Sequence, residues 1–223
     1  MTWQIPRRWR WCLAAIPLLA GCETIPLQRP IETPLLTPIT VERGASHPVG
    51  FQRVAIRIAP GTPVGAFHEG LLRVPQYPLT WQGQVTAVSE QLNAIATEEL
   101  KGAGYEVVGG PSGLFEVAER EKVRFLIGGV IANLAFNTYG ILAGNKSDAS
   151  VVVQWEIMDA GPRQVVLTRT SSGAGSTGGQ SAAALLVAFR NAFRTFLADR
   201  SVAELLTKRV PARPAEPQDP HIY

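Results

Sequence analysis

An alternating pattern between residues 151 and 158 constrains the fold of this chain more than any other feature. A period of two residues, with β-branched and aromatic side chains on one side, predicts a β-strand. Apolar segments at 125–134 and 164–171 flank this strand, and turn-forming sequences at 144–148 and 160–163 separate the three. The sequence therefore predicts a three-stranded antiparallel meander. The residues on the apolar side of its middle strand are Val151, Val153, Trp155 and Ile157.

Two segments with a helical period accompany the predicted meander. One runs from 85 to 103 and the other from 181 to 198. A strand at 53–59, a short strand at 105–108 and a short helix at 114–122 complete the order. We therefore predict an α/β fold of the α+β type, a mixed sheet with an antiparallel C-terminal meander and helices packed on one face. The apolar stripes of the two long helices are Val88, Leu92, Ile95, Ala96, Leu100 and Ala103, and Leu185, Phe189, Ala192, Phe193 and Phe196.

Two segments rich in Gly, Pro or Ser are predicted to be irregular. The first, 61–83, carries Phe67, Tyr77 and Trp81, which we interpret as candidate partner-contact residues because long loops often carry recognition. The alternative is that the segment covers a sheet edge with Trp81 in the core. The second, the connection 171–180, is also a candidate contact surface.

The N-terminus has the composition of an export signal. Arg7, Arg8 and Arg10 precede an apolar run at 12–19, which is too short to span a bilayer because a spanning helix needs about 20 apolar residues. Small residues and a cysteine follow this run. The sequence predicts that residues 1–21 are a signal peptide that is removed.

The end of this signal resembles the lipobox of bacterial lipoproteins. Leu19, Ala20 and Gly21 match its recognition positions, and Cys22 matches the cysteine that is acylated and becomes the new N-terminus. The resemblance implies a membrane anchor through Cys22, and Glu23, in place of Asp, implies an outer-membrane anchor with the domain in the periplasm. The alternatives are an ordinary signal peptide that contains Cys22, or a cytosolic chain with an apolar start.

Removal of the signal changes how charge and cysteine content are interpreted. Residues 1–21 contain three of the 21 Lys and Arg residues and none of the 18 Asp and Glu residues, which leaves 18 of each. A balanced charge argues against a nucleic-acid partner, because phosphate binding needs a basic excess. Of the two cysteines, Cys12 lies in the signal and Cys22 in the lipobox, so no disulfide is predicted. The expected order is a Pro-rich tether at 22–50, an α/β domain at 51–209 and a disordered tail at 210–223.

The chemical motifs in the sequence do not predict an enzyme. Residues 173–178 satisfy G-x-G-x-x-G, but no acidic residue at the end of a following strand completes a dinucleotide site. His47, His68 and His221 are far apart in the sequence and are predicted to be exposed to solvent. We therefore expect no catalytic residues, no cofactor and no metal.

A wider resemblance covers most of the chain after the signal. The segments 100–108, 125–130, 151–159 and 165–170 resemble the periplasmic domain shared by the curli secretion-channel lipoprotein, the lipoprotein activators of penicillin-binding proteins and the N-terminal domain of the Tol translocation protein. A closer resemblance is to a lipoprotein-like domain that precedes some trypsin-like proteases. It rests on Leu79-Thr80-Trp81, Gly104-Tyr105, Leu114-Phe115-Glu116 and Val153-Gln154-Trp155.

These resemblances imply a non-catalytic, lipid-anchored accessory domain that binds another protein of the cell envelope. A homo-oligomer is compatible with them. Two alternatives remain: an accessory lipoprotein of an envelope transporter, and a regulatory domain that works with a trypsin-like protease.

Overall fold

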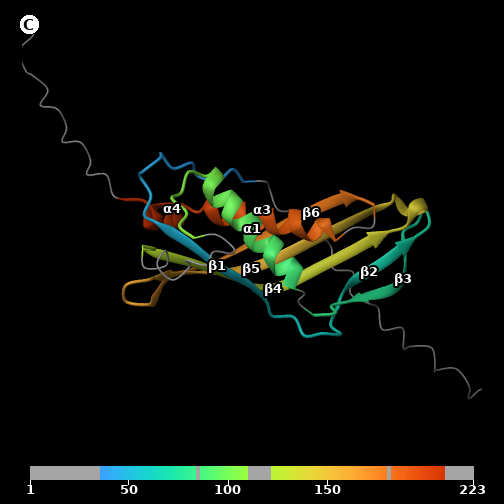
Figure 1. Ribbon diagram of the computed structural model, residues 1–223. Helices are drawn as coiled ribbons and strands as arrows, with labels where there is room; N and C mark the ends of the chain where they lie inside the picture. The colour runs from blue at the N-terminus through green and yellow to red at the C-terminus, as the bar shows by residue number, and fades with distance from the viewer. Residues whose placement is uncertain (1–35, 84–85, 110–121, 180–181, 209–223) are drawn as a thin grey trace, which may run out of the picture.

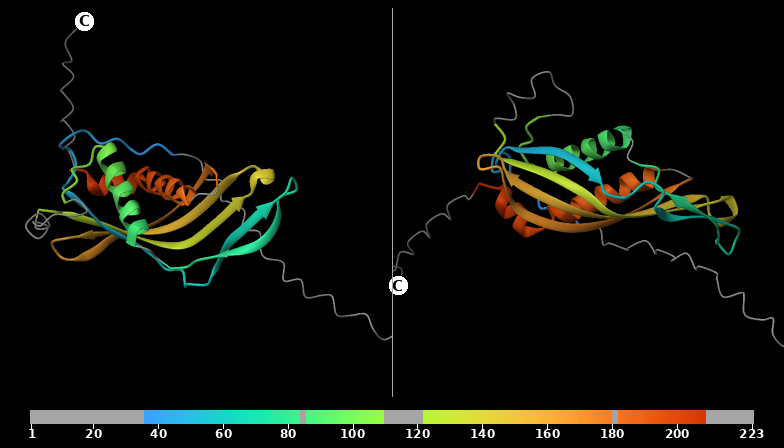
Figure 2. Two further views of the ribbon diagram at one scale, coloured as in Figure 1. Left: turned by 45° about the vertical axis from the view of Figure 1, so that its right-hand side comes forward. Right: turned by 90° about the horizontal axis from the view of Figure 1, so that it is seen from below.

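A six-stranded mixed sheet carries its helices on one face, which confirms the predicted fold class (Figures 1 and 2). The computed structural model describes residues 36–83, 86–109, 122–179 and 182–208. Within this part of the chain, no helix is long and apolar enough to cross a membrane. The strands are β1 (Val49–Ile56), β2 (Pro63–Glu69), β3 (Val74–Thr80), β4 (Phe125–Tyr139), β5 (Lys146–Asp159) and β6 (Gln164–Gly178). The helices are α1 (Thr86–Gly102), the 3₁₀ turn η1 (Ile141–Ala143), α3 (Ala183–Leu197) and α4 (Arg200–Leu206).

The long strand β4 organises the sheet. Its partner β5 pairs with β6, so that β4, β5 and β6 form the predicted antiparallel meander. On its other edge β4 has two partners: β1 runs parallel to its first half, and β2 runs parallel to it at Thr138 and Tyr139. The hairpin of β2 and β3 therefore extends the sheet at one end of the molecule (Figure 1).

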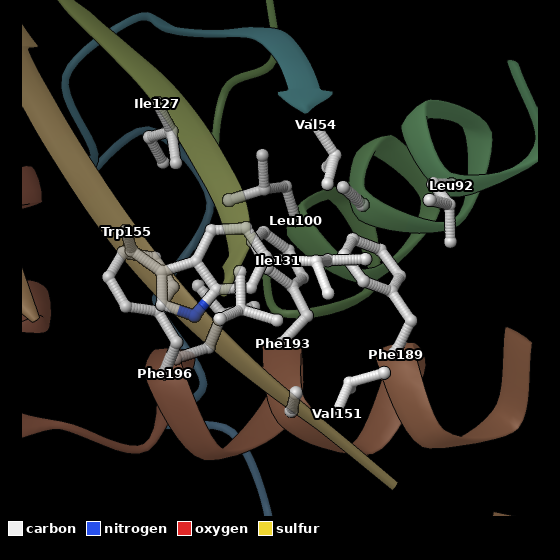
Figure 3. Close-up of a cluster of buried hydrophobic side chains, with 14 of the residues drawn as sticks. Val54, Leu92, Leu100, Ile127, Ile131, Val151, Trp155, Phe189, Phe193 and Phe196 are labelled. Atoms are coloured by element: carbon white, nitrogen blue, oxygen red, sulfur yellow. The ribbon is translucent and has the colours of Figure 1, made fainter. Parts of the chain in front are cut away.

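The main core lies between the meander and the two long helices. The predicted apolar side of β5 is fully buried, and the predicted stripe of α3 is buried with it. The ring of Trp155 lies within 5.7 Å, centroid to centroid, of the rings of Phe189, Phe193 and Phe196 (Figure 3). Gly129 on β4 leaves space for this indole, since an added Cβ would lie 2.6 Å from a ring carbon. Burial of such large rings supplies much of the hydrophobic stabilisation of a domain.

A short hydrogen-bond chain also joins the indole to α3. The Trp155 Nε1–H donates to Ser171 Oγ at 2.7 Å, and the Ser171 hydroxyl donates to the carbonyl of Ala192 at 2.7 Å. A buried indole N–H needs such a partner, because an unpaired buried donor is costly. These two hydrogen bonds therefore fix the Trp155 ring in one orientation against α3.

The glycine-rich segment 171–178 belongs to β6, so the predicted flexible connection at 171–180 is wrong for these residues. At Gly173 an added Cβ would collide with the Ala188 carbonyl and the Ala192 amide of α3, and at Gly175 it would lie 2.5 Å from the Ala188 amide. Glycine and alanine let the helix and strand backbones approach closely. The G-x-G-x-x-G match is therefore a packing surface in strand conformation.

The second half of the expected tether packs on the domain. The amides of Ile39, Val41 and His47 donate to the carbonyls of Leu197, Ala103 and Leu206, and the Val41 side chain is buried. Residues 39–48 are thus part of the folded unit, and β1 begins at Val49. Residues 22–35 and the tail 210–223 lie outside the described residues.

The predicted positions of the helices and of the short strand at 105–108 were confirmed only in part. Residues 85–103 and 181–198 contain α1 and α3 as predicted, but 105–108 forms only one bridge, Val107 to Val49. The short helix expected at 114–122 lies outside the described residues except for its last position. The helix α4 begins after Asp199, its N-cap, whose side chain accepts from the Ser201 amide at 2.8 Å.

Candidate functional site

The candidate site lies at the β2–β3 hairpin, in the segment predicted to be a loop. The prediction of an irregular 61–83 is wrong, because β2 and β3 pair antiparallel from Pro63 and Thr80 to Glu69 and Val74. Its alternative, that the segment covers a sheet edge, describes the structure better. All three predicted contact residues, Phe67, Tyr77 and Trp81, therefore come from one hairpin or its end.

The hairpin is fixed to β4 by a buried polar cluster. Asn137 Oδ1 accepts from the Ala66 amide at 3.0 Å and lies 3.4 Å from His68 Nε2. The other ring nitrogen of His68 lies 2.9 Å from the Arg73 carbonyl, and its ring stacks on Tyr139 with centroids 4.9 Å apart. The predicted exposure of His68 is wrong, since the side chain is buried.

The three predicted contact residues occupy two separate places. The Phe67 and Tyr77 rings are direct cross-strand partners and stack at 5.0 Å with an interplanar angle of 11°. Tyr77 keeps about half of its surface in water. Trp81 is half-buried at the end of β3 and packs against the main core. Only Trp81 lines the apolar pocket of this region.

This pocket is an open hollow of about 220 Å³ between the hairpin, the second half of β4 and the start of α3. Thr80 supplies its one hydroxyl side chain, and none of its lining residues is charged. An apolar hollow of this kind favours an apolar group with little hydrogen-bonding demand. We call it the hairpin groove. Its lining residues are Val64, Leu79, Thr80, Trp81, Leu134, Phe136, Ala182 and Leu185.

The sequence predicted only one residue of the groove as a contact. Leu79 belonged to the expected loop, Leu134 to a predicted strand and Leu185 to a predicted helix, and three separate segments had to meet to form the hollow. The only local sign of the groove in the sequence was the apolar residue Leu79, two positions before Trp81. The neighbouring Gly65 makes the approach of β2 possible, because a Cβ there would collide with the Phe136 carbonyl.

Four titratable groups of the described residues have shifted pKa values, and none of them lines the hairpin groove: Tyr105, Tyr139, Arg194 and Asp199. Burial raises the pKa of Tyr105 to about 12, and its hydroxyl has no hydrogen-bond partner within the described residues. Hydrogen bonds from Ser201 hold the pKa of the helix cap Asp199 below its usual value. In the described ranges no group of three or more His, Cys, Asp and Glu side chains is placed to hold a metal ion.

The residue predicted to be acylated, Cys22, lies outside the described residues, as does His221. The structure therefore bears on the contact surface and leaves the anchor as a prediction from the sequence.

No protein-family model matches the chain, and no curated protein matches it. It resembles the solved structure of protein XCC0632 from Xanthomonas campestris at 13% identity, over 77% of this chain and 90% of that chain, with a TM-score of 0.43. It also resembles PelC from Paraburkholderia phytofirmans, solved as a dodecamer, at 17% identity over 73% and 91%, with a TM-score of 0.38. A third is lipoprotein GNA1162 from Neisseria meningitidis, at 12% identity over 71% and 97%, with a TM-score of 0.30. Similarity of this degree assigns neither a family nor a function to the chain.

Proposed function

We propose that this chain is a non-catalytic, lipid-anchored binding domain of the bacterial cell envelope, and that it binds another envelope protein in the hairpin groove. The anchor is the acylated Cys22 of the lipobox-like sequence, which holds the domain at the outer membrane and in the periplasm. The observation that carries the binding role is the groove itself, a hollow open to solvent with no charged lining residue, whereas two other hollows of the described residues are lined in part by charged side chains such as Arg57 and Lys101.

The size of the groove limits what it can accept. A protein cavity of about 150 Å³ lined by Leu, Ile and Phe is large enough to hold benzene. The hairpin groove, at about 220 Å³, therefore has room for one aromatic ring or one branched aliphatic side chain. Aromatic anchor residues buried in such pockets are among the few residues that carry most of the binding energy of a protein interface.

The rigidity of the groove supports the same role. Its walls are strands of the main sheet and a helix fixed to that sheet, and Asn137 and His68 hold the hairpin in place. A preformed site loses less conformational entropy on binding than a loop that must become ordered. Its partner can be a subunit of an envelope transporter or a protease, and identification of the crosslinked protein decides between them.

The experiment is site-specific photo-crosslinking in cells from position 79, which lies in the groove. The control is the same photo-reactive residue at Val165, an exposed position at the other end of the meander. We expect position 79 to yield one discrete envelope adduct that position 165 does not. Identical adducts from both positions, or none from position 79, would contradict the proposed binding site.

The anchor is tested separately by Cys22→Ser. We expect this variant to lose its acyl group, shown by mass spectrometry of the purified protein. Acylation retained in the variant would refute the assignment of Cys22.

A further inference from the structure

Two neighbouring loops at the outer end of the hairpin expose four aliphatic side chains. Leu71 and Leu72 of the β2–β3 turn are 87% and 89% exposed, and Ile141 and Leu142 of η1 are 81% and 65% exposed. The views agree that the two loops lie side by side at the end of the sheet farthest from α4 (Figures 1 and 2). Scattered exposed leucines are ordinary, but an exposed apolar cluster usually marks an interaction site. We call these four residues the apolar tip.

Hydrogen bonds hold the two loops of the tip together. The Gly140 amide donates to the His68 carbonyl at 2.8 Å, which joins the start of η1 to the end of β2. The Asn145 amide donates to the Gly140 carbonyl at 2.9 Å, and the Arg73 amide to the Gly70 carbonyl at 3.0 Å, which closes each loop on itself. Gly140 packs against the Glu69 carboxylate, which would have to move aside for an added Cβ. The aliphatic side chains are thus displayed on a preformed base.

Below the aliphatic side chains lies a layer of aromatic and cationic groups. The Arg73 guanidinium lies 5.5 Å and the Lys146 ammonium 5.1 Å from the centre of the Tyr139 ring. Lys146 also pairs with Asp148 at 2.8 Å, and Glu69 lies beside η1, so this layer has no net charge. Aliphatic side chains at the end with tyrosine and basic side chains behind them match the depth profile of a bilayer interface.

We propose that the apolar tip inserts into the boundary between headgroups and acyl chains of a phospholipid bilayer. Membrane-surface attachment grows with the apolar area that is buried, and the tip offers four aliphatic side chains on two adjacent loops. The hairpin groove, in contrast, is hollow and suits a protein side chain. Because the layer behind the tip is neutral, insertion depends little on anionic lipid.

The position of Cys22 in the sequence favours a bilayer over other binding partners of the apolar tip. Cys22 precedes Leu36, the first described residue, by 14 positions. A chain reaches at most about 3.3–3.6 Å per residue, so 14 positions bound the distance from Cys22 to the domain at roughly 50 Å. An acylated Cys22 therefore keeps the domain within reach of a membrane and raises the effective concentration of lipid at the tip. This step rests on the proposed anchor, whereas the affinity of the tip for lipid does not.

The test is vesicle flotation of the chain from residue 22 onward carrying Cys22→Ser, which has no acyl group. Vesicles of phosphatidylcholine alone and of phosphatidylcholine with phosphatidylglycerol are compared. We expect the protein to bind both kinds of vesicle. The double variant Leu71→Glu/Leu72→Glu should lower the affinity for vesicles at least about tenfold, because each leucine buried in the bilayer contributes roughly a factor of ten or more to that affinity. The matched control is Val165→Glu/Val166→Glu, which alters two exposed valines at the other end of the sheet and leaves binding unchanged.

A second measurement keeps the proposal testable if the double variant misfolds. A Leu72→Trp variant places a reporter at the tip, and brominated lipids in the vesicles should quench the additional fluorescence. No flotation of the unacylated protein, no quenching at position 72, or equal loss in both double variants would overturn the proposal. Loss of self-association instead of lipid binding in the tip variant would identify a second copy as the occupant and also overturn it. Crosslinking from position 79 is independent of these results, so the proposed partner site and the tip can fail separately.

Discussion

The two ends of the meander have different surroundings although the same strands run through both. At one end β1 pairs with β4, α1 and α3 cover the sheet, and Trp155 with its three phenylalanine neighbours lies in the core between sheet and helices (Figure 3). At the other end the β2–β3 hairpin replaces β1 beside β4, and it leaves an open groove and an exposed apolar tip. The largest buried rings therefore lie at the covered end, and the most exposed aliphatic side chains, Leu71, Leu72 and Ile141, lie at the hairpin end.

An irregularity in β4 marks the boundary between the two ends. The register with β5 shifts between Ile131 and Asn133, so that Ile131 and Leu134 are buried while Ala132 and Asn133 are exposed. A bulge changes which side chains face inward and bends the strand. Before the bulge β4 supplies the main core, and after it Leu134 and Phe136 line the groove.

The largest effect is expected at the covered end, from Trp155→Ala. Removing a buried aromatic ring costs about 3–5 kcal/mol, because apolar contacts are lost and a cavity remains. The variant also leaves the Ser171 hydroxyl without its indole donor. The free energy of unfolding is measured by urea denaturation. Tyr77→Ala, on the exposed hairpin surface, is the comparison and should cost at most about 1 kcal/mol, because it loses only the stacking on its cross-strand partner Phe67.

Substitution of Gly173 tests the close approach of β6 to α3. We expect Gly173→Ala to cost about 2–3 kcal/mol, because the added methyl group must displace the backbone of α3. Gly178→Ala is the matched control in the same strand, where an added Cβ meets no atom within 4 Å. Equal unfolding free energies for the two variants would contradict the packing role of Gly173.

The ion-pair cluster between α1 and α3 is expected to have a smaller effect. Glu99 is almost buried and accepts from Arg194 at 2.7 and 3.1 Å, while Arg190 lies 3.1 Å away. Glu99→Gln should lower the free energy of unfolding by about 1–2 kcal/mol, because hydrogen bonds to charged groups are among the stronger ones. Glu98→Gln, at an exposed carboxylate that also pairs with Arg190, should cost less than about 0.5 kcal/mol. A larger loss of unfolding free energy in Glu98→Gln than in Glu99→Gln would contradict the claim that burial makes the Glu99 ion pairs the stronger ones.

The smallest expected effect is a pH dependence at the cap of α4. Hydrogen bonds from Ser201, and then the contact with Arg169, hold the pKa of Asp199 below its ordinary value of 3.8. The ionised cap therefore stabilises the fold above about pH 3.8, and this contribution disappears as the pH falls through the folded-state pKa. In acid titrations followed by circular dichroism, Asp199→Asn should differ from the wild type near neutral pH and converge with it in acid. A constant difference across this range would exclude the carboxylate as the cause.

The covered end was predicted well from sequence because its elements have clear periods. The alternation at Val151–Ile157 and the stripe of α3 both correspond to buried faces. The hairpin was missed because Pro75 and Pro78 argue against a strand. Proline is tolerated on an edge strand, and β3 is the edge of the sheet. Likewise, 171–178 has the composition of a loop, whereas its glycines make room for α3.

The groove could not be predicted in the same way, since Val64, Leu134 and Leu185 come together only through the tertiary fold. Trp81 was identified because it is a large aromatic residue in a Gly- and Pro-rich segment. The tip was missed because Leu71-Leu72 and Ile141-Leu142 are short apolar pairs, whose exposure depends on the loops that carry them.

The most direct test of the division between the two ends combines Leu79→Glu with photo-crosslinking from position 81. Leu79 is only partly buried, so the variant should keep a melting temperature within a few degrees of the wild type. A carboxylate in an apolar groove is strongly disfavoured unless it remains hydrated, so we expect the envelope adduct to be lost. An adduct that persists at wild-type yield in the folded variant would contradict the assignment of binding to the hairpin groove.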